Sequence, residues 1–340
     1  MGSKCYHTVM KRIRNTIFPA LVLLSLAACQ FTPGTTGFTP TSPTITATST
    51  EVRVEPTTTA TSTATEIPSI TPTSTPIPPV EFAVIGDYGT GDVNEQEVAE
   101  LVLSWNPDFI ITTGDNNYPL GSQETIDAHI GQFYHSYIGN YKGEYGEGSD
   151  INRFFPSLGN HDWYTGSANP YLDYFDLPGN ERYYKFSWQF IDFFVLDSTW
   201  LEPDGILSGS IQEKWLEEQI SQSTAVWKIV YFHHAPYTSG YHESSTWMRW
   251  PFDEWGIDLV LSGHSHVYER LEVNSLTYIV NGVGGGGVYD FVNILPESIV
   301  RYNQNMGAMK MVVTPTQLTG TFITKAGELI DEFTLTHNDQ

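Results

Sequence analysis

Five short polar clusters stand out in the sequence, and each carries side chains that can bind a metal ion. The clusters are Gly86-Asp87-Tyr88-Gly89, Gly114-Asp115-Asn116-Asn117-Tyr118, Gly159-Asn160-His161-Asp162, Val230-Tyr231-Phe232-His233-His234 and Gly263-His264-Ser265-His266. Six of the ten histidines lie in or near them, at positions 161, 233, 234, 242, 264 and 266. Carboxylates, an amide oxygen and imidazoles together suit borderline divalent or ferric ions, not ions that prefer thiolates. The clusters therefore predict a metal site.

The mixture of donors suits a pair of metal ions. Two ions about 3.5–4 Å apart can hold both the attacking and the leaving oxygen of a phosphoryl displacement. Such a pair needs a bridging oxygen ligand, and the carboxylate of Asp115 can give one oxygen to each ion. His264 and His266 are two residues apart, so an extended backbone would point both to one side. Tyr118 precedes Pro119, which favours an extended backbone and holds the phenol near Asp115.

Short apolar runs that end at the clusters predict the strands that position these side chains. The runs cover residues 80–85, 108–113, 154–158, 227–232 and 257–261. Four clusters place a potential ligand directly after a glycine at the end of such a run. Loops at the carboxyl ends of strands converge in an α/β sheet, and glycine permits a sharp turn and a close approach of the backbone. The ligands are therefore expected to meet.

The remaining pattern predicts an α/β domain with helices covering sheets. Helical spacing over residues 94–105 between the first two runs predicts a βαβ unit with parallel strands and a right-handed crossover. Further helices are expected over residues 126–137 and 211–220, and a hairpin over residues 183–196. Residues 310–335 are typical of antiparallel strands with a turn at Ala326-Gly327.

The first 28 residues predict an export signal. Three basic residues, at positions 11, 12 and 14, precede an apolar run over residues 17–26 that is too short to span a membrane. Leu26-Ala27-Ala28-Cys29 resembles the lipobox of bacterial lipoproteins, which implies a signal peptide over residues 1–28 and a lipid on Cys29. The protein would then be exported and anchored to the cell membrane on its extracytoplasmic face. An ordinary cleaved secretory signal is the alternative, and the true start is Met1 or Met10.

Residues 29–79 predict a disordered stalk rich in Thr, Ser and Pro. Of the 50 residues from 31 to 80, 32 are Thr, Ser or Pro, so the segment cannot bury enough apolar surface to offset its ordering entropy. The catalytic domain is expected over residues 80–340.

Composition excludes several classes of function. Lys and Arg total 16 and Asp and Glu total 39, so the formal net charge is −23 and the surface repels polyanions such as nucleic acid. The two cysteines, Cys5 and Cys29, lie before the folded part, which excludes a disulfide framework or a cysteine-based zinc site there.

The ordered set of five clusters resembles the calcineurin-like metallophosphoesterase superfamily, and within it the purple acid phosphatase type. Many members carry Asp-x-His in the first motif, whereas this sequence has Gly89 at the histidine position. Tyr118, three residues after Asp115, lies where purple acid phosphatases place a tyrosinate ligand. The resemblance covers most of residues 80–340. It implies a layered αββα sandwich of mixed β-sheets flanked by helices.

The resemblance also implies a ligand set for two metal ions. The first, Fe³⁺, would be held by Asp87, Asp115, Tyr118 and His266. The second, Zn²⁺, Fe²⁺ or Mn²⁺, would be held by Asp115, Asn160, His233 and His264.

The implied reaction is attack of a metal-bound hydroxide on a small phosphate monoester. His161 would contact the substrate phosphate, and His242, nine residues after His233, would be a second such histidine. His242, or alternatively His161, would protonate the leaving oxygen as a general acid.

Two other functions fit the sequence. A phosphodiesterase or nucleotide-cleaving member of the same superfamily would share the motifs, because loops such as residues 163–176 and 238–247 set the leaving group. A non-catalytic surface module on a stalk would use the metals only structurally.

Four neighbouring features carry smaller expectations. Asp162 is expected to orient an imidazole, Asp197 to be structural, and His234 to pack beside the site. Residues 282–287 resemble a phosphate loop but lack a following Lys-Ser/Thr, so a flexible turn near the site is expected.

Overall fold

A computed structural model describes residues 77–337 of the chain. The predicted signal peptide, the candidate lipid site at Cys29 and nearly all of the predicted stalk lie outside the described residues. Within residues 77–337, no helix has the length and apolar character needed to cross a membrane.

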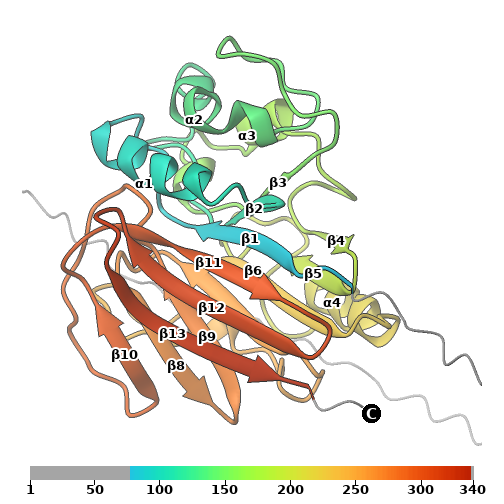
Figure 1. The fold of residues 1–340 in the computed structure, drawn as a ribbon. Coiled ribbons are helices and arrows are strands. Elements are labelled where there is room, and N and C mark those ends of the chain that lie inside the picture. The colour runs from blue at the N-terminus through green and yellow to red at the C-terminus, as the bar shows by residue number, and fades with distance from the viewer. Residues whose placement is uncertain (1–76, 338–340) are drawn as a thin grey trace, which may run out of the picture. The chain divides into compact units, whose positions relative to one another are not determined.

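Two mixed β-sheets form the centre of the described region (Figure 1). The six-stranded sheet has the order β13-β12-β11-β1-β2-β3. Its strands are β1 (Val80–Ile85), β2 (Phe109–Thr112), β3 (Phe154–Pro156), β11 (Gly307–Val313), β12 (Gln317–Thr324) and β13 (Leu329–Thr336). The seven-stranded sheet has the order β10-β8-β9-β7-β6-β5-β4. Its strands are β4 (Tyr184–Trp188), β5 (Ile191–Val195), β6 (Trp227–His234), β7 (Leu259–Gly263), β8 (Tyr268–Val273), β9 (Leu276–Asn281) and β10 (Ser298–Tyr302).

Parallel pairing is confined to the strands that lead to the polar clusters and their neighbours. β1 pairs parallel with β2 and β2 with β3, while β11, β12 and β13 extend that sheet in antiparallel fashion. β5, β6, β7 and β9 pair parallel in the other sheet, and β4, β8 and β10 flank them antiparallel. The predicted hairpin and the predicted antiparallel C-terminal strands are confirmed. β8, β9 and β10 were not predicted from the sequence.

The main apolar core lies between the two sheets. Phe82 of β1 and Phe109 of β2 stack on each other, and both meet Phe193 of β5 edge-on at centroid distances of 5.3 and 5.4 Å. All three are fully buried. Sheet-on-sheet packing of this kind holds the carboxyl ends of β1 and β2 against those of the other sheet.

A second core covers the outer face of the seven-stranded sheet. Along β6, Ile229 and Tyr231 join the core between the sheets, whereas Val230 and Phe232 join the outer core with Leu216 of α4 (Ile211–Ser221). This alternation is the two-residue period of a strand buried on both faces. The expected layered αββα sandwich is confirmed.

Helix α1 (Val93–Ser104) makes the crossover between β1 and β2 and confirms the predicted βαβ unit. It begins at Asp92, whose side chain accepts hydrogen bonds from the backbone N–H groups of Asn94 and Glu95. The cap satisfies donors that the first helical turn leaves free.

Residues 126–137 are helical as expected, but the helix is irregular. Asp127 accepts hydrogen bonds from the hydroxyls of Tyr141 (2.6 Å) and Tyr174 (2.8 Å), which tie this turn to neighbouring segments. The irregular stretch consists of a π-helical turn (Asp127–Gly131), α2 (Gln132–Tyr134) and a 3₁₀ turn (His135–Tyr137). The other helical segments are α3 (Asn169–Tyr174) and 3₁₀ turns at His161–Trp163 and Thr246–Met248.

Candidate metal centre

The structure brings the seven predicted ligands together where the carboxyl ends of strands from both sheets meet. The loops that follow β1, β2 and β3 carry Asp87, Asp115, Tyr118 and Asn160. The other sheet contributes His233 at the end of β6, and His264 and His266 in the loop after β7. Positions up to 177 residues apart in the sequence are thereby in contact.

Three of the ligand positions have an unusual backbone. Asp87, Asp115 and His264 have φ angles of 54°, 52° and 68°. Residues other than glycine rarely adopt this left-handed conformation, and such strain concentrates at functional sites. The strand ends thus turn sharply one residue after the glycine.

The glycines before the ligands are needed for close approach. A Cβ atom on Gly263 would collide with the carboxylate of Asp87, and one on Gly159 would collide with the carboxylate of Asp115. Any larger residue at these two positions would displace one of these carboxylates.

The first donor group gathers around the phenol of Tyr118. Its hydroxyl lies 3.0 Å from Asp115 Oδ2, 3.3 Å from Asp87 Oδ1 and 3.1 Å from His266 Nε2. His266 Nε2 is also 3.3 Å from Asp87 Oδ1. These four residues are the ones that the resemblance assigns to the first metal ion.

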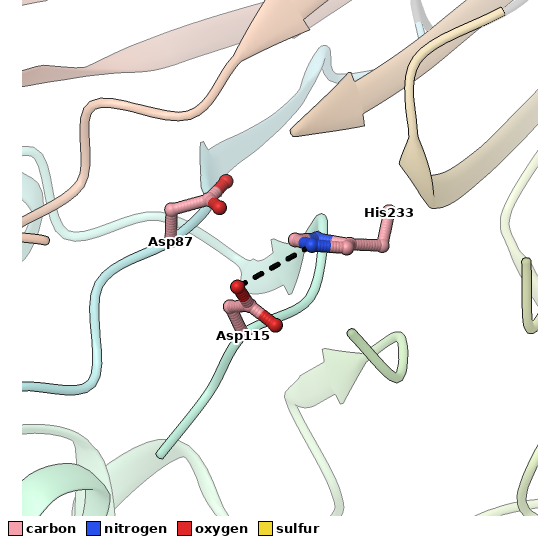
Figure 2. Close-up of side chains that lie close together, drawn as sticks. All are labelled: Asp87, Asp115 and His233. Carbon is pink, nitrogen blue, oxygen red and sulfur yellow. Dashed lines mark ion pairs between the residues drawn. The ribbon is translucent and has the colours of Figure 1, made fainter. Parts of the chain in front are cut away.

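The second donor group gathers around Nε2 of His233. This nitrogen lies 3.1 Å from Asn160 Oδ1, 3.1 Å from His264 Nδ1 and 3.4 Å from Asp115 Oδ2. Figure 2 shows Asp115 and His233 facing each other, with Asp87 beside them. Asp87, Asp115 and His233 are all buried and offer ligand atoms within 4.8 Å of one another.

Asp115 Oδ2 belongs to both groups. It is the shared atom of the two sets of distances, while Asp115 Oδ1 accepts a hydrogen bond from the backbone N–H of His161 at 2.9 Å. Donor atoms of one coordination shell lie about 3.0–3.5 Å apart when each metal–ligand bond is about 2.0–2.2 Å. The observed separations of 3.0–3.4 Å match this spacing, so the residues fit a pair of small cations.

Backbone contacts set the tautomer of His233. Its Nδ1 lies 2.9 Å from the carbonyl oxygen of Thr113, which can only accept, so Nδ1 carries the proton. Nε2 therefore points its lone pair, or a second proton, at the donor group. A carbonyl partner of this kind is typical of metal-binding histidines.

Charges within the site shift the pKa values of the ligands. Burial disfavours the charged imidazolium of His233, but the carboxylates of Asp115 and Asp87 outweigh burial and raise its pKa to about 10. Burial also disfavours the Asp115 carboxylate, but His233 and His161 hold its pKa well below the usual range. A proton on His233 thus balances the carboxylates, and a bound metal ion would replace that proton.

The two predicted substrate histidines lie beside the donor groups. Nδ1 of His161 donates to the carbonyl oxygen of Pro119 at 2.7 Å, so Nε2 faces the site, 3.9 Å from Asp115 Oδ2. His242 is half-buried, and its ring stacks on that of His264 at a centroid distance of 4.3 Å. Both imidazoles therefore border the space next to the ligands.

Aromatic side chains that the sequence did not single out also line the site. The ring of Tyr289 stacks on His266 at 4.1 Å, nearly parallel, and Tyr164 lies 4.5 Å from His161. The hydroxyl of Tyr164 accepts a hydrogen bond from Asn160 Nδ2 at 2.7 Å. Their only sequence signal was proximity to the third cluster and to the glycine run.

The expectation for Asp162 was wrong. It orients no imidazole: its carboxylate accepts hydrogen bonds from the backbone N–H of Gly159 (2.8 Å) and from the side-chain amide of Asn116 (2.9 Å). It thus ties together two of the loops that carry ligands. Burial and the charge of Asp115 raise the pKa of Asp162 to about 7.

The extended backbone expected between His264 and His266 is absent. Residues 264–267 form a bend after β7, and the left-handed φ of His264 turns its ring toward the second group while His266 reaches the first. Two imidazoles thus serve different groups through a turn.

The glycine run is closely packed on the first cluster. The N–H groups of Gly284 and Gly286 donate to the carbonyl oxygens of Gly86 (2.9 Å) and Asp87 (2.7 Å). The expected turn is therefore near the site, but these hydrogen bonds fix it to the loop after β1.

Two further expectations match the contacts. His234 shares a hydrogen bond with the hydroxyl of Ser198 at 2.9 Å and packs beside His264. Asp197 accepts from the indole of Trp163 at 3.0 Å and from the backbone N–H of Thr199 at 2.8 Å.

Comparison with known proteins agrees with this arrangement. A family model described as calcineurin-like phosphoesterase matches residues 80–268, more than half of the chain. Purple acid phosphatase 3 of Arabidopsis thaliana is 26% identical over 297 residues, covering 76% of this chain and 78% of the relative. A protein named Fe(3+)-Zn(2+) purple acid phosphatase 12, from the same plant, is 26% identical over 231 residues, covering 63% of this chain and 48% of the relative.

Solved structures share the fold at low identity. Purple acid phosphatase PPD1 from yellow lupin seeds is similar with a TM-score of 0.62 and 16% identity, covering 76% of this chain and 54% of that one. GAP50, described as the anchor in the inner membrane complex of Plasmodium, has a TM-score of 0.60 and 20% identity, covering 78% of this chain and 90% of that one.

Proposed function

The chain belongs to the calcineurin-like phosphoesterase family and is a metal-dependent phosphoester hydrolase of the purple acid phosphatase type, and we propose that it cleaves phosphate monoesters with two metal ions. One observation carries the proposal. Two donor groups share Asp115 Oδ2, which lies 3.0 Å from the Tyr118 hydroxyl and 3.4 Å from His233 Nε2. A carboxylate placed between two complete donor sets suits a bridged pair of cations.

The fold alone would not support an enzyme, since GAP50 shares it and is described as an anchor. The donor set is the stronger argument. Two carboxylates buried against imidazole nitrogens are costly to keep out of water, and a surface module has no need of such a cluster. We therefore favour catalysis over the non-catalytic alternative.

The donor types support Fe³⁺ at the first site. A phenol and two carboxylates are hard oxygen ligands, and a relative is named for an iron and zinc pair. Burial, with the carboxylates of Asp115 and Asp87, raises the pKa of Tyr118 well above its ordinary value. Only a strongly charged cation would ionise this phenol.

The second site has an amide oxygen, two imidazoles and the shared carboxylate, Asp115. This set suits Zn²⁺, Fe²⁺ or Mn²⁺. When bound, the two cations would neutralise charge on the transferring phosphoryl group and lower the pKa of a water molecule to about 7.

The protein's own residues hold the substrate and move a proton. The hydrogen bond from Nδ1 to the carbonyl oxygen of Pro119 fixes the ring of His161, so that Nε2 faces a phosphate oxygen of the substrate. The ring of His242 stacks on that of His264, and when protonated it donates to the leaving alcohol oxygen. Burial lowers the pKa of His242, which makes its imidazolium a stronger acid.

The experiment that tests the proposal compares two esters. Purified full-length protein should hydrolyse p-nitrophenyl phosphate faster than bis(p-nitrophenyl) phosphate, and should contain two metal ions per chain by elemental analysis. Preference for the diester would make the protein a phosphodiesterase, and one ion per chain would contradict the shared carboxylate.

We further propose that the enzyme works outside the cytoplasm on a lipid anchor at Cys29, where it would release phosphate from small extracellular esters. The Leu26-Ala27-Ala28-Cys29 string supports this location. Cys29→Ser should release the protein from the membrane fraction. Continued membrane association of that variant would contradict the anchor.

A further inference from the structure

A separate hollow opens beside the candidate metal centre. It has a volume of about 360 Å³ and is lined by Tyr241, His242, Val288, Tyr289 and Asp290. His242 stacks on His264, and Tyr289 stacks on His266, so the hollow shares a wall with both donor groups. The hollow is therefore adjacent to the space beside the ligand residues where a phosphate ester would bind.

Two tyrosines give the hollow an aromatic wall. The ring centroids of Tyr241 and Tyr289 are 5.8 Å apart, with an angle of 63° between the ring planes. Tyr241 is 64% exposed and Tyr289 is 36% exposed, which is unusual for large aromatic side chains that only fill a core. A cation that lies over the face of either ring, within about 6 Å of its centroid, is attracted by the negative face of that ring.

One carboxylate lines the hollow and could hold a cation. Asp290 adds a carboxylate, and none of the five lining residues is Lys or Arg. The chain as a whole carries a net charge of −23. The carboxylate of Asp290 would repel a leaving group that has its own phosphate or carboxylate, whereas that carboxylate and the ring faces would attract an organic cation.

Backbone contacts hold the wall in place before any ligand binds. The N–H of Tyr289 donates to the carbonyl of His266 at 2.8 Å, and its carbonyl accepts from Asn303 at 2.8 Å. Gly240 and Phe291 form a β-bridge that joins the loops carrying the two tyrosines. A preformed pocket loses less conformational entropy on binding.

We propose that this hollow, the tyrosine–carboxylate pocket, receives the leaving group of the substrate and that this group is a small organic cation, a quaternary ammonium alcohol. The inference rests on the proposed phosphatase function, which places the phosphate. In the reaction, water adds to phosphorus, the ester P–O bond breaks, and the alcohol oxygen leaves with a proton. The products are the ammonium alcohol and inorganic phosphate.

Choline phosphate and 3,3-dimethylbutyl phosphate test this inference, because they have the same shape and differ in the positive charge. With the metal-loaded full-length protein, kcat/KM should be about tenfold higher for choline phosphate, the effect of a cation held against aromatic faces and a carboxylate. p-Nitrophenyl phosphate serves as the reference substrate.

Variants of the pocket residues test whether the pocket causes the preference for choline phosphate over its neutral analogue. Tyr241→Ala and Asp290→Asn should each lower the ratio of the two kcat/KM values about threefold or more, while Tyr241→Phe should keep it because the ring face remains. Tyr145→Ala and Asp150→Asn are matched controls: both residues are exposed and line no part of this pocket, and the ratio should not change.

A binding measurement separates this inference from the proposed function. Calorimetric titration of the metal-loaded full-length protein should show tighter binding of choline than of 3,3-dimethylbutan-1-ol, and Tyr241→Ala should remove the difference. Choline binding without hydrolysis of any ester would overturn the phosphatase function and keep the pocket assignment. Hydrolysis of p-nitrophenyl phosphate with no preference for choline phosphate over its neutral analogue would overturn the pocket assignment alone. A preference for phenyl phosphate or a nucleoside monophosphate that depends on Tyr241 would also overturn it, since the pocket would then take a flat ring.

Discussion

The two sheets supply the candidate metal centre with different chemistry. Loops of the six-stranded sheet give only oxygen donors: two carboxylates, a phenol and an amide, from Asp87, Asp115, Tyr118 and Asn160. The seven-stranded sheet gives only imidazoles, from His233, His264 and His266. Each donor group nevertheless takes members from both sheets. Neither sheet can hold a metal ion as proposed without the other.

Hydrogen bonds between the two sheets hold their ligand-bearing loops in position. The N–H of His264 donates to Asp87 Oδ2 at 2.9 Å, and His233 donates to the carbonyl of Thr113 at 2.9 Å. Asp87 thus contacts the second sheet through both carboxylate oxygens, since Oδ1 meets His266. Because one sheet supplies the oxygen donors and the other the imidazoles, the candidate centre forms only when the two sheets pack together. Metal binding should in turn stabilise that packing.

The strongest test removes the one atom that both groups share. Asp115→Asn keeps the shape of the side chain but removes the charge that bridges the two sides. Both metal ions should be lost, and kcat/KM for p-nitrophenyl phosphate should fall by about 10⁴-fold, equivalent to about 5 kcal/mol. Steady-state kinetics and elemental analysis measure this.

Asp150→Asn is the control for that variant, because Asp150 is exposed and is not a member of either donor group. An Asp115→Asn protein that retained both ions and most of its activity would show that the carboxylate is not a shared ligand.

A second test asks whether residues from opposite sheets serve the same ion. Asn160→Ala and His264→Ala should each remove the second ion and leave the first, with activity lower by about 10²–10³-fold. The two variants should agree in metal content although one lies on each sheet. Loss of iron from either one would assign that residue to the other group.

Removal of the metals should loosen the contact between the sheets. A cation present at about 100 times its dissociation constant contributes about 2.7 kcal/mol to the stability of the folded state. At about 2–4 °C per kcal/mol for a domain of this size, chelation should lower the Tm by about 5–10 °C. Circular dichroism melts with and without a chelator measure the change, and Asp115→Asn should show none. An unchanged wild-type Tm would mean that the sheets pack independently of the metals.

The smallest expected change in rate concerns the phenol. Tyr118→Phe should lower kcat by no more than about tenfold, because the first group retains its two carboxylates and an imidazole. If Tyr118 binds Fe³⁺, the purified protein should absorb visible light through phenolate-to-iron charge transfer, and this variant should lose the band. Tyr145→Phe, at an exposed tyrosine, should keep it. A colourless active enzyme that contains only zinc or manganese would contradict iron but not hydrolysis.

The sequence by itself determined the strands of both sheets that lead to the site and the candidate ligands that follow them. Each strand is a local apolar run, and Asp87, Asp115, Asn160 and His264 come directly after its terminal glycine. The short apolar runs and the glycine at the end of each run are enough to predict these positions, because the carboxyl ends of strands in a parallel sheet converge.

Only the tertiary structure decided which atoms meet. The contact of Tyr118 with His266 spans 148 positions, and that of His264 with Asp87 spans 177. Asp162 accepts a hydrogen bond from the amide of Asn116 and not from an imidazole, and Tyr241 contacts Tyr289 beside the centre. Side-chain direction at these positions depends on neighbours from another sheet or loop, and no local pattern in the chain records those neighbours.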